Sequence, residues 1–149
     1  FSASYGQPQI KDCSHLVVIC SKQGINSVDI NNYIDLIVNT RKVDRQEVKP
    51  FQNMIESAVL NMNTNEQSIW ASKQAYIALG NLLSACALFD IDACPMETFQ
   101  TEKYDSILQL EQKGLSASVL AALGYRSKSD SYQHKQKVRK PLDQLISDI

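Results

Sequence analysis

The feature that most constrains the fold is a long apolar helical segment in the middle of the chain. Residues 64–67, Thr-Asn-Glu-Gln, match a capping box, in which the threonine hydroxyl and the glutamine amide satisfy each other's backbone N–H groups. The helix that begins there runs to about Leu88, and its middle is apolar almost all round. Such a helix must be covered, so we predict that it lies in the core or between subunits. Small residues that permit close helix approach recur along it: Ala71, Ala75, Ala78, Gly80 and Ser84.

Three shorter segments carry strand patterns. Residues 16–20 form a continuous apolar run rich in β-branched side chains, which is typical of a strand buried on both faces of a sheet. A short strand is predicted at 91–94, followed by Pro95, and a longer one at 115–123.

Helices and loops fill the remaining chain. Helices are predicted at 27–41 with Ser27 as N-cap, at 47–62 with Pro50 in the first turn, and at 102–110. Loops are predicted at 1–11 and 126–134. The last stretch, 142–149, is compatible with a final helical turn or with a docked extended arm.

Length and composition exclude several classes of protein. The 149 residues fit a single domain, 1–149, that is large enough to bury a core. A net charge of -1 gives no general attraction to nucleic acid or to anionic membranes, so we expect neither as a partner. No apolar run reaches the roughly 18 to 20 residues that span a bilayer, and no signal-peptide pattern is visible, so we expect a cytoplasmic protein.

The cysteines do not suggest a metal site. Their spacings match neither CxxC nor a zinc pattern, so we expect structural buried thiols at Cys13, Cys20, Cys86 and Cys94. Asp12 and His15 flank the first cysteine and could suggest a metal, but capping and packing at the start of a strand are favoured. We therefore predict no metal.

No segment carries a familiar catalytic motif. The five glycines form neither GxGxxG nor GxxxxGK[ST], and no carboxylate pair, Ser/His/Asp set or Cys/His set can be singled out. This pattern indicates either an enzyme whose organic cofactor carries the chemistry or a protein that is not an enzyme.

A basic cluster near the C-terminal end is a candidate anion site. It consists of Lys135, Lys137, Arg139 and Lys140. In an extended segment, alternate side chains would converge on one anion, and a phosphate suits one lysine and one forked guanidinium. A solvated charged face is the alternative. Residues 95–99, Pro-Met-Glu-Thr-Phe, read alone as an ordinary strand-to-helix connection.

Several segments together resemble the FMN-dependent nitroreductase family. The resemblance is carried by residues 70–82 and 92–99, continues in order through 111–114, 123–126 and 137–141, and includes 12–18. It covers nearly the whole chain and is weakest between residues 21 and 67. It implies an α+β fold with a mixed sheet flanked by helices, and an intertwined homodimer that binds flavin at the subunit interface.

The resemblance also implies contacts to the flavin ring. The backbone around Glu97 and Thr98 would face the isoalloxazine, with an amide N–H directed at its reactive N5. Pro95 and Met96 would line the face of the ring, and Gln9 would contact its pyrimidine end. Many members have glycine at the position of Thr98, so a β-branched residue there is expected to alter the loop or crowd the substrate face.

Further implied contacts involve the phosphate and the substrate. Lys137 and Arg139 fall where the family binds the FMN phosphate, and Phe51 falls where an aromatic gate often covers the substrate pocket, although core packing explains Phe51 equally well. Family members begin with an arginine- and serine-containing helix that adds phosphate and ribitol contacts, and none of it appears here. We therefore expect that the chain lacks the family's N-terminal segment.

The implied function is an oxidoreductase in which FMN, rather than a catalytic side chain, carries the chemistry. NADH or NADPH would deliver hydride to flavin N5, leave, and be replaced by a nitroaromatic or quinone-type acceptor, which is a ping-pong mechanism. Two alternatives stay open: a related flavoprotein of different reaction, such as a dehalogenating or flavin-cleaving enzyme, and a non-enzymatic binding or dimerisation fragment.

Overall fold

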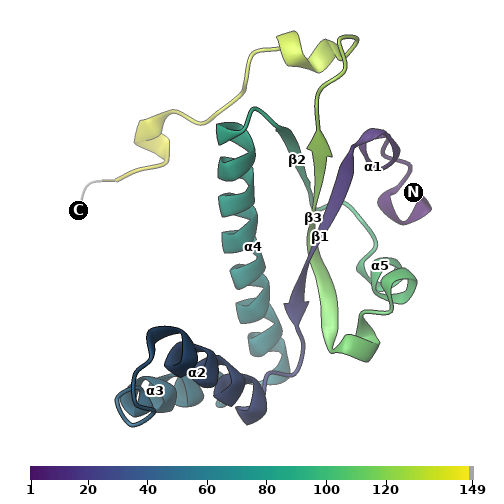
Figure 1. Ribbon diagram of the computed structural model, residues 1–149. Helices are drawn as coiled ribbons and strands as arrows, with labels where there is room; N and C mark the ends of the chain where they lie inside the picture. The colour runs from purple at the N-terminus through teal and green to yellow at the C-terminus, as the bar shows by residue number, and fades with distance from the viewer. Residues whose placement is uncertain (148–149) are drawn as a thin grey trace.

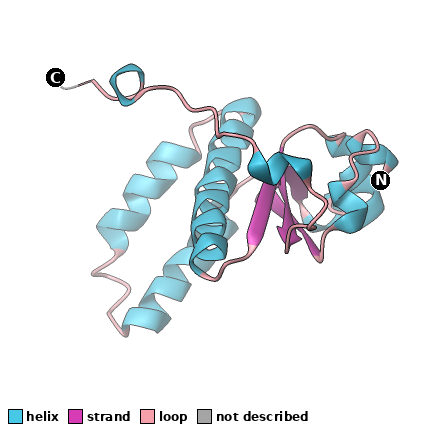
Figure 2. Cartoon of the chain, turned by 90° about the horizontal axis from the view of Figure 1, so that it is seen from above, coloured by secondary structure: helices cyan, strands magenta, loops and turns pink. Residues whose placement is uncertain are grey.

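The computed structural model describes residues 1–147, which form a small sheet with helices on both faces (Figures 1 and 2). The strands are β1 (His15–Lys22), β2 (Asp92–Met96) and β3 (Leu115–Gly124), in the order β1-β3-β2. Both strand pairs are antiparallel. The predicted α+β fold is confirmed. A mixed sheet was predicted, but within residues 1–147 the sheet contains antiparallel strand pairs only.

The helices follow the predicted order. They are α1 (Gln9–Asp12), α2 (Ser27–Arg41), α3 (Lys49–Val59), α4 (Thr64–Leu88) and α5 (Thr101–Leu108). Short 3-10 turns are η1 (Ser2–Ser4), η2 (Glu111–Lys113), η3 (Ser131–His134) and η4 (Leu142–Gln144). The predicted loop at 1–11 therefore contains two short helical segments, and α3 is shorter than the predicted 47–62.

The central strand is β3, and its residues alternate between two apolar layers. Val119 and Ala121 pack with Leu79 of α4 on one face, and Leu120 packs with Met96 in the cluster under α5 and η1 on the other. The 16–20 run forms part of β1 and packs on both faces of the sheet, as predicted: Leu16 and Val18 contact the cluster under α5, and Val17 and Ile19 contact the cluster under α4. Its residues are half-buried, because β1 has one strand neighbour among the described residues.

Both long helices are capped one residue earlier than predicted. Asn63 is the N-cap of α4: its Oδ1 accepts from the Glu66 backbone N–H at 3.0 Å, and Glu66 Oε2 accepts from the Asn63 N–H at 2.8 Å. Asn26 caps α2 in the same reciprocal way with Asp29. Asparagine forms the box here because an acidic residue follows it three positions later, which is the spacing that the motif requires.

The helices α2 and α3 pack on each other beside the first turns of α4, away from β2 (Figure 1). Ile30, Ile34 and Ile37 form their buried seam. A buried glutamine, Gln52, donates from Nε2 to Asn31 Oδ1 at 3.1 Å and to Glu56 Oε1 at 2.7 Å, which joins the two helices through polar contacts.

Two further expectations differ from the structure. The thiol of Cys94 is exposed, and among the four cysteines Cys86 is buried and the other two are half-buried, so uniform thiol burial is wrong. Pro95 lies inside β2 rather than after it, which an edge strand tolerates. For the C-terminal stretch, the turn η4 matches the helical one of the two predicted alternatives, and the side chains of Leu142, Leu145 and Ile146 are exposed. The last two residues, 148–149, lie outside the described part.

Within residues 1–147, none of the helices has the length and apolar character needed to cross a membrane. The same residues contain no cluster of three or more His, Cys, Asp or Glu side chains placed to hold a metal ion.

Candidate functional site

A hollow of about 1000 Å³ lies at the end of the sheet where β2 begins and β3 ends. The methyl group of Ala122 and the absence of a side chain at Gly124 leave room there. A Cβ added to Gly124 would lie 3.2 Å from the Ser14 backbone nitrogen, so a close approach of two backbones explains this glycine. Residues from four segments line the hollow, among them Gln9, Cys13, Cys94, Pro95, Tyr132 and Lys137.

A second hollow of about 720 Å³ adjoins the first and lies against the C-terminal end of α4. Leu83, Ala87 and Arg139 line it. Asp92, Ala93, Pro95 and Arg126 border both hollows, so the start of β2 separates them. The two hollows together offer an extended surface along an edge of the sheet.

The edge of β2 directs backbone groups outward. Pro95 stands opposite Ala121 and has no N–H to donate to the ladder. Glu97 and Thr98 follow the end of the strand, and within residues 1–147 neither of their backbone N–H groups forms a hydrogen bond. Successive side chains of a strand point to opposite faces. The Met96 side chain is buried in the core, so Met96 does not line the surface on which Pro95 is exposed.

The loop after β2 is held by two side chains from outside it. Tyr76 Oη of α4 donates to Glu97 Oε1 at 2.5 Å, and Gln7 Nε2 donates to the Thr98 carbonyl at 2.7 Å. The hydrogen bond to Glu97, together with burial, raises the pKa of the Tyr76 phenol. Thr98 does not adopt a positive φ, so the backbone here does not require glycine.

The two candidate phosphate ligands lie on the segment between η3 and η4. This segment has no regular strand geometry, and Lys137 and Arg139 border adjacent hollows rather than one. Arg139 Nη1 donates to the neighbouring Val138 carbonyl at 2.8 Å. Within residues 1–147 neither cation forms an ion pair with a carboxylate, so both are available to an anion.

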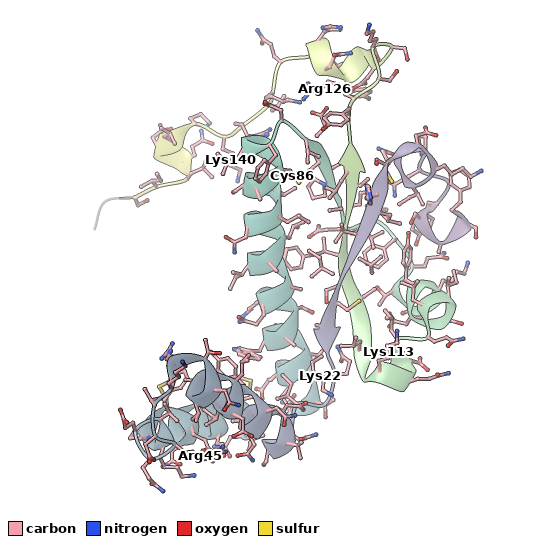
Figure 3. The ribbon with its side chains drawn as sticks, viewed as in Figure 1. Lys22, Arg45, Cys86, Lys113, Arg126 and Lys140 are labelled. Atoms are coloured by element: carbon pink, nitrogen blue, oxygen red, sulfur yellow. The ribbon has the colours of Figure 1, made fainter. Side chains whose placement is uncertain are left out.

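An ion pair fixes the chain where it leaves β3, before η3. The Arg126 backbone N–H and Nε donate to Asp92 Oδ2 at 2.8 and 2.9 Å, and the guanidinium also pairs with Oδ1. The hydrogen bonds from Arg126, with a smaller contribution from nearby Lys137, lower the pKa of Asp92. Figure 3 shows Arg126 beyond the end of β3, and Lys140 beside the C-terminal end of α4.

The structure brings together most, but not all, of the predicted site residues. Gln9, Pro95 and Lys137 share one hollow, Arg139 borders the next, and Glu97 and Thr98 follow directly along β2. Phe51 is not among them: its ring lies on α3 and faces Tyr33 of α2, with ring centroids 6.5 Å apart.

Sequence reasoning missed the contacts that Tyr76, Gln7, Asp92 and Arg126 make. Each of these contacts joins residues that are at least 21 positions apart, and no local sequence pattern predicts it.

The chemistry of the donor set fits a flavin mononucleotide. The two free cations, Lys137 and Arg139, suit a phosphate, and the unbonded backbone N–H of Glu97 suits a ring nitrogen.

Comparisons with known sequences identify the family of the chain. The profile of the Nitroreductase family matches residues 12–125. A relative from Staphylococcus haemolyticus, assigned as an NAD(P)H nitroreductase, is 32% identical over an alignment of 148 positions that covers 94% of this chain and 66% of the relative. The major NAD(P)H-flavin oxidoreductase of Aliivibrio fischeri is 30% identical over 145 residues, 96% of this chain and 66% of that protein. The chain thus spans just under two thirds of the length of these curated relatives.

Solved structures share the fold. A nitroreductase family protein from Streptococcus pneumoniae superimposes with a TM-score of 0.80 at 15% identity, covering 99% of this chain and 72% of that one. A protein from Exiguobacterium sibiricum solved in complex with FMN gives a TM-score of 0.79 at 13% identity, covering 99% and 68%.

Proposed function

Because the chain belongs to the nitroreductase family, we propose that it binds FMN and acts as an NAD(P)H-dependent oxidoreductase on a small-molecule acceptor. The observation that carries the proposal is that Gln9, Pro95 and Lys137 line one hollow, with the unbonded backbone N–H of Glu97 two residues beyond Pro95. The relative from Aliivibrio fischeri is named for NAD(P)H and flavin, and a neighbour of the same fold was solved with FMN.

In this proposal the chain binds and orients the cofactor. Lys137 and Arg139 neutralise the phosphate, Gln9 supplies a polar contact to the pyrimidine end of the ring, and exposed Pro95 supports the ring face. Met96 contacts the flavin through its backbone alone, because its side chain is buried in the core. The Glu97 and Thr98 amides are the donors to the ring edge. When bound, FMN supplies hydride transfer between NADH or NADPH and an acceptor of the nitroaromatic or quinone type.

The proposed assembly is a homodimer. Large apolar side chains remain exposed at the end of α4 and on the C-terminal segment, including Leu88 at 83%, Phe89 at 75% and Val138 at 89%. A second copy of the chain is the partner that would cover them. The same assembly is needed if Phe51 gates a substrate pocket, since α3 lies apart from β2 within one chain (Figure 1).

The experiment is a reconstitution with FMN followed by steady-state kinetics. NADH and NADPH oxidation are measured against nitroaromatic and quinone acceptors, with both concentrations varied. We expect flavin-dependent turnover and parallel double-reciprocal lines, the pattern of a ping-pong mechanism. Flavin binding with turnover confined to dehalogenation or flavin cleavage would identify a related flavoprotein instead. Failure to bind FMN would contradict the proposal and leave a binding or dimerisation fragment.

A further inference from the structure

The loop at 97–100 is tied to elements on both faces of the sheet. From the α4 face, Tyr76 Oη donates to the Glu97 carboxylate at 2.5 Å. From the opposite face, Gln7 Nε2 donates to the Thr98 carbonyl at 2.7 Å, and the Gln100 N–H donates to the Ala3 carbonyl at 2.8 Å. Three of the four loop residues are therefore held by a helix and by the N-terminal segment, which have no covalent connection near the loop.

We propose that Tyr76 and Gln7 are positioning residues that clamp this loop from two sides and fix the direction of its outward backbone amides. The clamp is a property of the chain itself. Its effect on a flavin rests on the proposed function, because that function places the Glu97 amide against the ring.

The contacts act on the backbone through geometry. A side-chain bond at Glu97 and a carbonyl bond at Thr98 restrain the peptide that joins these two residues from both ends. A third bond, from the Phe99 N–H to the Glu97 carbonyl at 3.0 Å, closes the turn. Donors that are fixed before a ligand arrives need no reorganisation when it binds, which is the condition for strong electrostatic tuning.

The exposure of Tyr76 sets the scale of the effect. Tyr76 is 41% exposed, so water competes with Glu97 for its hydrogen bond. The bond therefore adds little to the free energy of unfolding. The hydrogen bonds from Tyr76 and Gln7 both end on a loop outside the helices and strands. Such a loop moves by local opening rather than by global unfolding. The clamp is therefore expected to change the loop's opening and the ligand's electronics more than the unfolding midpoint.

A fixed amide at the ring edge has a definite redox consequence. An N–H aimed at a ring nitrogen favours the redox state in which that nitrogen accepts a hydrogen bond, which is the oxidised state of a flavin N5. Loosening the clamp removes this preference in part. A tenfold loss of preference corresponds to a rise of about 30 mV in the two-electron midpoint potential.

The first experiment needs no flavin. Amide hydrogen exchange of Phe99 and Gln100 is measured in the flavin-free chain, because both amides are hydrogen-bonded in the loop. Tyr76→Phe and Gln7→Glu should each speed this exchange by roughly fivefold or more. Tyr5→Phe and Gln112→Glu are the matched controls, since the side chains of Tyr5 and Gln112 are exposed and bond to none of the described residues, and they should exchange like the parent.

Variants of Glu97 separate the clamp from a general loss of packing. Glu97→Gln retains an acceptor for Tyr76 Oη and should stay close to the parent, whereas Glu97→Ala should match Tyr76→Phe. Combining Glu97→Ala with Tyr76→Phe should add nothing to either change alone, because both remove one interaction. Additive effects, or parent-like exchange in Tyr76→Phe and Gln7→Glu, would overturn the clamp.

The second experiment uses the FMN-loaded chain. The midpoint potential should rise by about 30 mV in Tyr76→Phe, stay at the parent value in Glu97→Gln, and rise further in Glu97→Pro, which removes the amide donor itself. An unchanged potential in Tyr76→Phe, with faster loop exchange, would overturn the redox consequence. A parent chain that binds no FMN would refute the proposed function, and the exchange measurements would still decide the clamp.

Discussion

At the scale of single residues, we expect the two free cations, Lys137 and Arg139, to be the strongest determinant of ligand choice. Changing Lys137 and Arg139 together to alanine should weaken FMN binding by about a hundredfold or more, since a hydrogen bond to a charged group contributes about 1.5 to 3 kcal/mol. Isothermal titration measures the change. Arg41→Ala with Lys103→Ala removes the same charge from α2 and α5 and should leave the affinity unaltered. An unchanged affinity in the first double variant would end the phosphate assignment.

The Asp92–Arg126 pair predicts a response to acid. Arg126 depresses the folded-state pKa of Asp92 below its ordinary value of 3.8. The pair therefore contributes stability that is present above that value and is lost as pH falls through the depressed folded pKa. An NMR titration of the Asp92 carboxyl should show the depressed pKa, and Arg126→Gln should return it toward 3.8. A carboxyl that titrates at its ordinary value in the parent chain would contradict the pairing.

At the scale of elements, the sequence predicted those helix and strand boundaries that depend on neighbouring residues alone. The end of α4 at Leu88 and the course of β3 follow from apolar periodicity. The caps were displaced by one residue because serine or threonine and asparagine compete at adjacent positions, and the acidic partner three residues later decides between them. The contacts Tyr76–Glu97 and Asp92–Arg126 could not be predicted, since they join elements whose relative placement only the packed sheet defines.

The close approach of β3 to Ser14 makes a further prediction about packing. Gly124→Ala should destabilise the fold by about 1 kcal/mol, because the added Cβ lies 3.2 Å from a backbone nitrogen that cannot move freely. Gly80→Ala is the matched control in α4: its Cβ would meet nothing within 4 Å, and removing a mid-helix glycine should stabilise by about 0.5 to 1 kcal/mol. Urea unfolding of both variants gives the comparison, and equal signs would contradict the packing argument.

At the scale of the whole molecule, the C-terminal segment is expected to join two copies of the chain. Leu142 and Ile146 are 73% and 63% exposed, so one chain leaves them uncovered. Removing residues 142–149 should weaken the homodimer and FMN retention together. Sedimentation at micromolar concentration measures the first and flavin absorbance after gel filtration the second. A stable flavin-loaded monomer, or a deletion that changes neither property, would refute this assembly.

The most direct measurement of the central claim compares two ligands on the unaltered chain. Riboflavin carries the ring of FMN but lacks the phosphate, so it tests the ring surface at β2 and the cations at Lys137 and Arg139 separately. We predict that fluorescence titration shows FMN binding about a hundredfold or more tighter than riboflavin, because two charge-assisted contacts are lost. Equal affinities, or no binding of either flavin, would contradict the proposed site.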